Sequence, residues 1–198
     1  MKLEKRTAYF KSEFRAAETA EDEKLYLEGY FIRYGEETEL FEGCFEEVAK
    51  GAARESLKQN DVRCLFNHDS GSVLGRTSNG TLHLQEDEKG VYGKVEINRS
   101  DPEAMSVYAK VKRGDIDACS FGFYVTEESS EKRDSGMKFF LEKVDVFEVS
   151  CVTFPAYPQT EIEARTNDIN RLSKRSLEIK KNNLRERIIN GIKANHVK

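Results

Sequence analysis

The sequence lacks the features by which membrane and secreted proteins are recognised. No part of its 198 residues approaches a run of about 18 consecutive apolar residues, which excludes a transmembrane helix. We expect no membrane partner. The basic start is not followed by an apolar segment, so we expect no secretory signal.

Cysteine is scarce and scattered, with no Cys-x-x-Cys pair. Cys44, Cys64, Cys119 and Cys151 are therefore expected to be reduced thiols of a cytosolic protein.

Several signatures of metal, phosphate and hydrolase sites are also missing. His68 and His83 do not lie at zinc-finger or zincin spacing from each other or from a cysteine. The chain has no phosphate-binding glycine loop, and the absence of Gly-x-Ser-x-Gly argues against an α/β-hydrolase. We therefore expect no metal site and no cofactor.

Charge divides the chain into two parts. Residues 166–198 contain nine Lys/Arg and three acidic residues, a net charge of +6, which leaves −10 for the remainder of a chain with a total of −4. We expect a loosely ordered leader over 1–24, one domain over 25–165 and a basic helical tail over 166–198. The tail has no aromatic residue for base stacking, which argues against nucleic acid as a partner.

Strand patterns dominate the expected domain. Helical spacing is found over 45–57 and again after Ser100, a candidate N-cap, with Gly114 as the expected stop. The composition of these elements predicts a mainly β protein with peripheral helices, an α+β fold built on a barrel or a sandwich. The segments expected as strands are 25–34, 62–66, 81–84, 91–97, 116–125 and 139–153.

Ser120 has an unusual setting within the expected strand 116–125. Alternation places Ala118, Ser120 and Gly122 on one face, so the hydroxyl is flanked by the two smallest side chains. Such flanking residues leave the open space that a substrate carbonyl needs to approach a nucleophile. A strand serine that makes only a local hydrogen bond has the same pattern, and this segment alone leaves both interpretations open.

A serine nucleophile needs a base and an orienting acid. His68 ends an apolar strand and opens a glycine-containing turn, from which its side chain can project into a cleft. His83 lies inside a hairpin strand, and His196 lies near the end of the tail. Glu148 interrupts an apolar strand face, where a carboxylate must be paired. A histidine would pair it, and so would one of the many lysines or arginines.

Three other residues compete for these roles. Asp69 and Asp145 are alternative acids, but Asp69 adjoins His68 in sequence and Asp145 lies on the opposite strand face from Glu148. Cys119 is an alternative thiol nucleophile. Its face of the strand also carries two phenylalanines, so we expect Cys119 in the core.

Four short motifs together resemble the tailed-phage prohead protease family, serine peptidases related to herpesvirus assemblin. The motifs are Asn67-His68-Asp69, Leu74–Thr77, Ser120–Phe123 and Glu148–Pro158, and their order and spacing also match. The resemblance covers most of the chain and implies an antiparallel β-barrel surrounded by helices. At the matching positions it implies a catalytic triad of Ser120, His68 and Glu148, in which the carboxylate replaces the second histidine of the herpesvirus relatives.

The same resemblance implies a function in capsid maturation. The implied substrates are the scaffold, or the N-terminal scaffolding segment of the major capsid protein, and the enzyme itself. The implied place of action is the assembling prohead in the host cytoplasm, and the family is consistent with a homodimer. We expect the basic tail to be removed by self-cleavage. A non-catalytic capsid scaffold or assembly protein is the alternative that the sequence leaves open.

Overall fold

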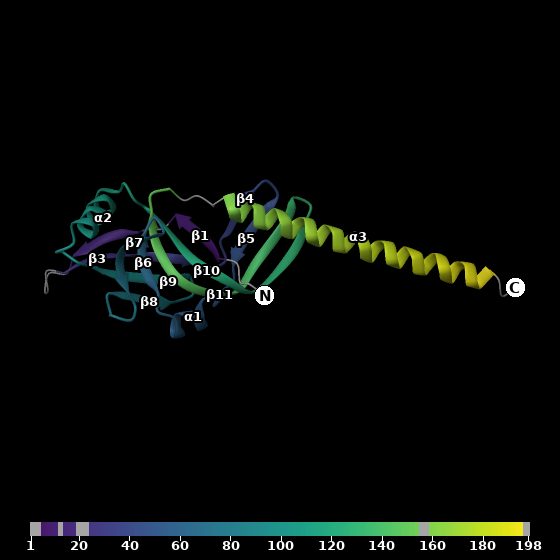
Figure 1. Cartoon of the computed structure of the whole chain (residues 1–198), viewed down its shortest axis with the longest axis horizontal. Coiled ribbons are helices and arrows are strands. Elements are labelled where there is room, and N and C mark those ends of the chain that lie inside the picture. The colour runs from purple at the N-terminus through teal and green to yellow at the C-terminus, as the bar shows by residue number, and fades with distance from the viewer. Residues whose placement is uncertain (1–4, 12–13, 19–23, 155–158, 196–198) are drawn as a thin grey trace. The chain divides into compact units, whose positions relative to one another are not determined.

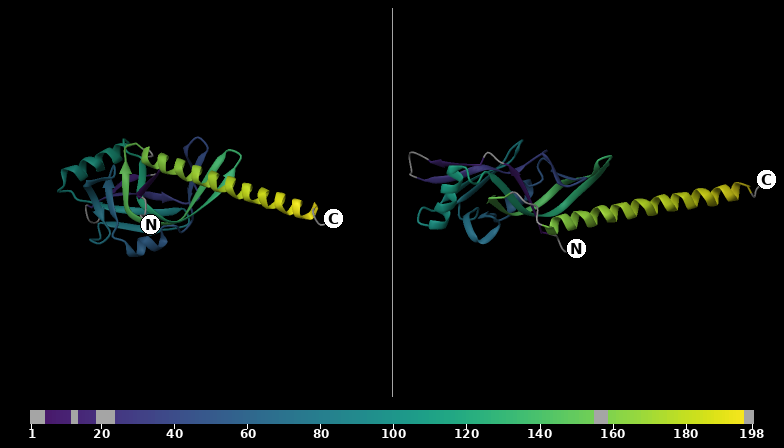
Figure 2. Two further views of the ribbon diagram at one scale, coloured as in Figure 1. Left: turned by 45° about the vertical axis from the view of Figure 1, so that its right-hand side comes forward. Right: turned by 90° about the horizontal axis from the view of Figure 1, so that it is seen from above.

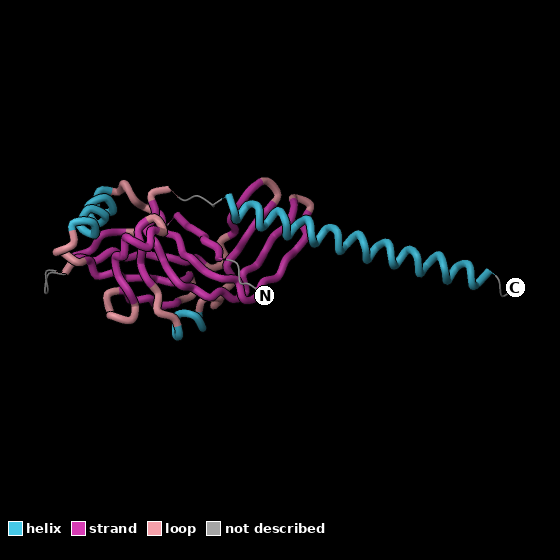
Figure 3. The backbone as a smooth tube through the Cα atoms, viewed as in Figure 1, coloured by secondary structure: helices cyan, strands magenta, loops and turns pink. Residues whose placement is uncertain are grey.

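The computed structural model describes residues 5–11, 14–18, 24–154 and 159–195, which fall into a body and a separate second unit. The body ends at residue 158 and consists mainly of strands (Figures 1 and 3). The second unit is the helix α3 (Gln159–Asn195), the helix expected for the tail, which begins before the expected residue 166. No helix in the described part of the chain is long and apolar enough to span a membrane.

The larger sheet of the body is organised by one long strand, β11. On one side β11 pairs antiparallel with β10, and on the other side it pairs parallel with β5 and, further along, with β6. The far ends of β10 and β11 form a long hairpin beside β4 and β5 (Figure 2). The sheet consists of β1 (Lys5–Lys11), β10 (Ala118–Arg133), β11 (Gly136–Val152), β5 (Cys44–Val48) and β4 (Glu37–Phe41), with β6 (Arg63–Phe66) and β7 (Asp69–Arg76) attached through β6.

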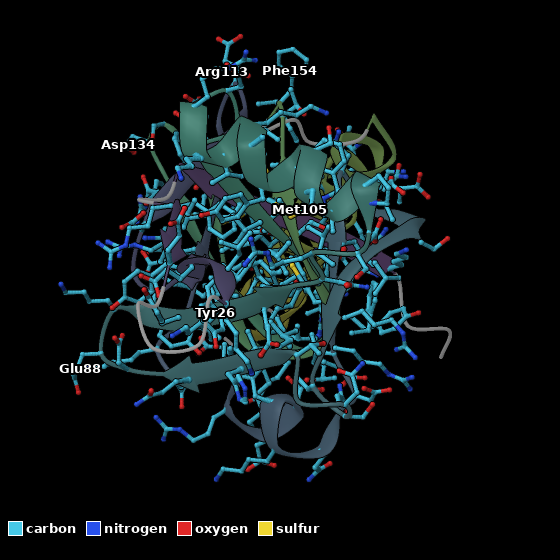
Figure 4. All side chains as sticks on the ribbon, turned by 90° about the vertical axis from the view of Figure 1, so that its left-hand side faces the viewer. Tyr26, Glu88, Met105, Arg113, Asp134 and Phe154 are labelled. Carbon is cyan, nitrogen blue, oxygen red and sulfur yellow. The ribbon has the colours of Figure 1, made fainter. Side chains whose placement is uncertain are left out.

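The smaller sheet is fully antiparallel and supplies the other wall of the core. Its order is β2 (Arg15–Glu18), β3 (Leu25–Arg33), β9 (Gly90–Ile97) and β8 (Leu82–Glu86). Alternate side chains of β3 are buried, as expected for a strand with one face on the core. From β10, Phe121 and Phe123 stack in this core with ring centroids 4.6 Å apart. Side chains fill the space between the strands, whereas Glu88 and Phe154 lie at the periphery (Figure 4).

Two helices accompany the sheets of the body, α1 (Arg54–Gln59) and α2 (Pro102–Arg113). The N-cap of α2 is Asp101, one residue after the expected Ser100, and its side chain accepts a hydrogen bond from the Glu103 N–H at 2.9 Å. Gly114 ends the helix as expected, in a left-handed conformation with φ 86°. The buried face of α2 packs against β2, β3, β7 and β9.

The mainly β, α+β fold is confirmed, and two details differ from expectation. The described strands form two open sheets, so the closed barrel implied by the family resemblance is not confirmed by this topology. The helix expected over 45–57 is wrong for its first part, because residues 44–48 form β5 and only residues 54–59 are helical. Every second side chain of β5 is buried, which is strand periodicity, and pairing with β4 and β11 satisfies its backbone.

The segment 1–24 also contributes strands, although the sequence pattern places none before Leu25. Residues 5–11 form β1 and pair with β10, and residues 15–18 form β2 and pair with β3. The polar composition of the segment conceals this, because pairing with β10, more than a hundred residues later, and with the neighbouring β3 holds its backbone.

Candidate active site

The pairing of β10 with β11 gathers four positions on one face of the larger sheet. Ser120 lies opposite Ser150, and Gly122 lies opposite Glu148. Directly opposed residues on neighbouring strands point to the same face, and so do residues two apart on one strand. The proposed nucleophile and the proposed acid therefore share a face, on adjacent strands.

His68 reaches this face from the turn between β6 and β7. The turn has two central residues, Asn67 and His68, with φ of 51° and 60°, between the paired residues Phe66 and Asp69. Positive φ at both central residues is the requirement of the type I′ hairpin turn, in which asparagine is favoured first and glycine second. Histidine at the second position is strained, and such strain is a feature of functional sites.

Asn67 fixes this turn to the end of β11. Its backbone N–H donates to the Cys151 carbonyl at 3.0 Å. Its side-chain oxygen accepts from the Thr153 N–H at 2.9 Å, and its amide nitrogen donates to the Thr153 hydroxyl at 3.3 Å. The position of His68 relative to β11 is therefore set by three hydrogen bonds from the preceding residue.

The structure brings His68 and Glu148 into direct contact. The distance from His68 Nδ1 to Glu148 Oε1 is 2.6 Å. The side chain of His68 is 30% exposed and that of Glu148 is 4% exposed. The second carboxylate oxygen, Oε2, accepts a hydrogen bond from the Ser150 hydroxyl at 2.7 Å. The buried carboxylate thus has a partner at each oxygen, which compensates for its removal from water.

Gly122 provides the space that this carboxylate occupies. A Cβ atom at position 122 would lie 2.4 Å from Glu148 Oε1 and 2.8 Å from the Phe147 ring, closer than non-bonded atoms approach. The open space next to Ser120, expected to admit a substrate carbonyl, is on this side filled by Glu148. In this structure the space at position 122 is therefore occupied by the carboxylate.

Ser120 lies on the same face but is covered in this structure. It is 1% exposed, and its hydroxyl donates to the Ala8 carbonyl of β1 at 2.8 Å. The structure therefore brings His68 into contact with Glu148. The Glu148 carboxylate lies over Gly122, which is two residues from Ser120 on the same strand. The Ser120 hydroxyl itself is bonded to β1.

The competing acids are occupied elsewhere. Asp69 Oδ1 accepts from the Gly71 N–H at 2.8 Å, within its own turn, and Asp145 Oδ1 accepts from the Asn60 amide at 2.5 Å. His83 is exposed in β8, opposite Lys94 of β9. His196 lies outside the described residues.

The cysteines belong to the core and not to the site. Cys119 is fully buried, as expected, and none of the four cysteines forms a disulfide. Burial raises the pKa of the Cys64 thiol well above its ordinary value, and the neighbouring Cys151 adds to the effect. A thiol in this environment stays protonated and is a poor nucleophile.

The motif Leu74–Thr77 has a structural role in β7. The Arg76 guanidinium forms a two-pronged hydrogen bond with the Asp61 carboxylate, with Nε 2.8 Å from Oδ2, and this holds the pKa of that carboxyl below its usual range. Thr77 accepts a hydrogen bond from the Val62 N–H at 2.9 Å. The motif therefore fixes β7 to the segment that leads into β6.

A cavity of about 340 Å³ adjoins His68 at the end of β11. It is lined by Asn67, His68, Val152, Thr153 and Phe154. Phe154 is 81% exposed at the periphery of the molecule (Figure 4).

Two contacts of the candidate site were not predicted from the sequence, those of Asn67 with the end of β11 and that of Ser150 with Glu148. Asn67 could have been predicted, because asparagine is favoured at the first central residue of a two-residue hairpin turn. Ser150 was harder to predict. Its position two residues after Glu148 shows only that the two side chains point to the same face of the strand.

We expect Gly122→Ala to lower the rate of peptide cleavage about 10²-fold, because the added methyl group displaces the Glu148 carboxylate from His68 and a shift of about 1 Å in a catalytic group has an effect of this size. The measurement is kcat for a cleavable peptide. Gly80→Ala is the control for strain outside the site, because a Cβ atom there meets no atom within 4 Å and its cost is the backbone strain of a φ of 76°. Equal kcat for the Gly122→Ala variant and the wild type would show that a methyl group at position 122 does not displace the Glu148 carboxylate.

A histidine held at Nδ1 by a buried carboxylate is the base and acid pair that serine hydrolases use; Ser120 lies on the same sheet face, with its hydroxyl bonded to the Ala8 carbonyl. The comparison with protein families agrees with this class. The chain belongs to the Caudovirus prohead serine protease family, whose model matches residues 10–175. The protein is therefore a viral serine protease of capsid maturation.

A comparison with solved structures finds the bacteriophage T4 capsid assembly protease, gp21. The two chains are 12% identical, with a TM-score of 0.49 over 77% of this chain and 99% of the other. No curated protein matches the sequence.

Proposed function

We propose that this protease cleaves peptide bonds with Ser120 as nucleophile, His68 as general base and Glu148 as the acid that orients His68. The observation that carries the proposal is the 2.6 Å contact between His68 Nδ1 and Glu148 Oε1, on the face that holds Ser120. With Nδ1 bonded to the carboxylate, the other ring nitrogen, Nε2, is the one that exchanges a proton with the serine.

The reaction follows from these roles. His68 Nε2 takes the proton of Ser120 as Oγ attacks the scissile carbonyl, and Glu148 stabilises the imidazolium that forms. His68 then returns the proton to the leaving amine, which releases the first product and leaves an acyl-enzyme. Water, activated by His68, hydrolyses the ester and restores the serine. Backbone N–H groups that face the carbonyl oxygen are required to stabilise the tetrahedral intermediate.

Attack requires two changes from the described state. The Ser120 hydroxyl donates to the Ala8 carbonyl, so Oγ must leave this acceptor and turn toward His68. Rotation about the Cα–Cβ bond of serine moves Oγ between staggered positions without moving the strand. Access of substrate to Ser120 further requires displacement of the cover that leaves it 1% exposed.

The proposed substrates are the scaffold or the N-terminal scaffolding segment of the major capsid protein, and the protease itself, inside the prohead in the host cytoplasm. Membership of the prohead protease family supports this choice. The cavity beside His68, with the exposed Phe154 at its rim, offers a surface against which an extended polypeptide can lie.

The test is co-expression of the full chain with the capsid protein and scaffold of the same phage, followed by mass spectrometry of every product. We expect a new N-terminus on the capsid protein or fragments of the scaffold, together with shortened forms of the protease. Purified protease treated with a fluorophosphonate is expected to carry the label on Ser120, as mapped by peptide mass. If the capsid protein and the scaffold stay intact and Ser120 carries no label, the result would instead favour the alternative that this chain is a non-catalytic scaffold or assembly protein.

A further inference from the structure

We propose that Ser150 is a positioning residue of this protease, which acts by holding the Glu148 carboxylate in the orientation that presents Oε1 to His68. The inference rests on the proposed function, because it assigns Ser150 a part in the work of Glu148. Ser150 Oγ donates to Glu148 Oε2 at 2.7 Å, while Oε1 lies 2.6 Å from His68 Nδ1.

The burial of the pair gives this hydrogen bond its importance. Ser150 is 0% exposed and Glu148 is 3% exposed, so water does not replace the serine if its hydroxyl is removed. A hydrogen bond to a buried charged oxygen is stronger than one between neutral groups, and its loss leaves that oxygen without a partner. The carboxylate would then turn about its terminal torsion toward a compromise geometry, since this torsion is broad and weakly restrained in glutamate.

The surroundings limit the carboxylate on its remaining sides. Gly122, opposite Glu148 on β10, leaves space for Oε1 and for no additional methyl group. The turn that carries His68 is fixed to β11 through Asn67. The acid is therefore confined between a fixed histidine and a glycine, and Ser150 holds the oxygen that neither of these contacts.

Ser150 is separate from the nucleophile, although the two serines lie directly opposite each other on β10 and β11. The hydroxyl of Ser120 donates to the Ala8 carbonyl, and that of Ser150 donates to Glu148. One strand pair thus presents two buried hydroxyl groups with different partners. The chemistry assigns attack to the first and orientation of the acid to the second.

The experiment measures kcat and KM of the full-length chain on a peptide that spans the cleavage site found by mass spectrometry. Ser150→Ala is expected to lower kcat about 10- to 100-fold while KM changes less than about twofold, because Ser150 does not contact substrate. Ser150→Cys replaces the hydroxyl with a larger thiol, which is a weak donor, and is expected to show a similar loss. Ser56→Ala is the matched control, since Ser56 is also buried and donates to the Ala53 carbonyl of its own helix region.

A double-mutant cycle separates positioning from general stability. In a Glu148→Ala background, which removes the acceptor of the Ser150 hydroxyl, Ser150→Ala is expected to cause no further loss in the rate of Ser120 labelling by a fluorophosphonate, because Ser150 acts through the carboxylate. An equal loss in both backgrounds would overturn the proposal. A normal kcat in both Ser150 variants would also overturn it. So would loss of the folded circular dichroism spectrum in both variants, because the hydrogen bond from Ser150 to Glu148 would then be needed for folding.

These outcomes differ from failure of the proposed function. If Ser120→Ala and His68→Ala retain activity, the triad itself is wrong, whatever the Ser150 variants show. If those variants are inactive and the Ser150 variants cleave normally, the triad stands and only the positioning role is lost.

Discussion

Ser120→Ala is expected to abolish cleavage of the capsid protein and of the protease itself. Loss of the nucleophile removes the covalent route, and the comparable change in a serine protease lowers kcat by roughly 10⁶-fold. The fold should survive, because the change removes one hydroxyl and its hydrogen bond to the Ala8 carbonyl, a stability loss of about 1 kcal/mol. The measurements are the mass of each partner after co-expression and the thermal midpoint of the purified variant.

Ser56→Ala again provides the matched control for this experiment. Ser56 is buried and donates to a backbone carbonyl at 3.0 Å, as Ser120 does at 2.8 Å. The two variants are expected to have similar thermal midpoints, and only Ser120→Ala is expected to be inactive. Processed capsid protein in the presence of Ser120→Ala would place the nucleophile elsewhere in the chain.

Glu148→Gln is expected to lower kcat by about 10⁴-fold with little change in KM. The amide has nearly the same shape as the carboxylate, so it can still accept from Ser150. It cannot stabilise the imidazolium, and its NH₂ group favours the histidine tautomer with the proton on the wrong nitrogen. The measurement is kcat and KM on the same peptide substrate as for the Ser150 variants.

A buried glutamate outside the site tests whether this loss is specific. Glu46 of β5 is 6% exposed, and Glu46→Gln is expected to keep kcat within a few-fold of the wild type. If Glu148→Gln cleaves as fast as Glu46→Gln, the orienting acid of the site is another residue. Asp69 and Asp145 are the remaining carboxylates that the sequence offers for this role, and each is bonded to another group in the structure.

Much of the body could be predicted from local patterns. The strand at 62–66 and the hairpin of β8 and β9 follow from alternation and turn residues, and α2 follows from its cap, its apolar face and Gly114. The helix expected over 45–57 was wrong in its first part, because the apolar spacing there fits both the helical and the strand period. Pairing with β4 and β11 makes this part a strand. β1 was missed because its partner strand begins more than a hundred residues later.

The candidate site shows the same division between local and distant information. Turn chemistry near His68, and a carboxylate on an apolar strand face, were visible in the sequence. The contact between them was not, because it depends on the parallel pairing of β6 with β11 and on the hydrogen bonds of Asn67 to the end of β11. The strained φ of His68 likewise exists only when the hairpin of β6 and β7 forms.

The sequence by itself determined a mainly β domain, a helical tail and three residues suited to serine protease chemistry, because periodicity, charge and residue type are local properties. Only the tertiary structure decided how these residues meet. It placed Glu148 over Gly122, joined the carboxylate to His68 and Ser150, and covered Ser120 with β1. These contacts depend on the register of strands distant in sequence, and a shift of β10 by one residue would turn Ser120 and Gly122 away from the face that carries Glu148.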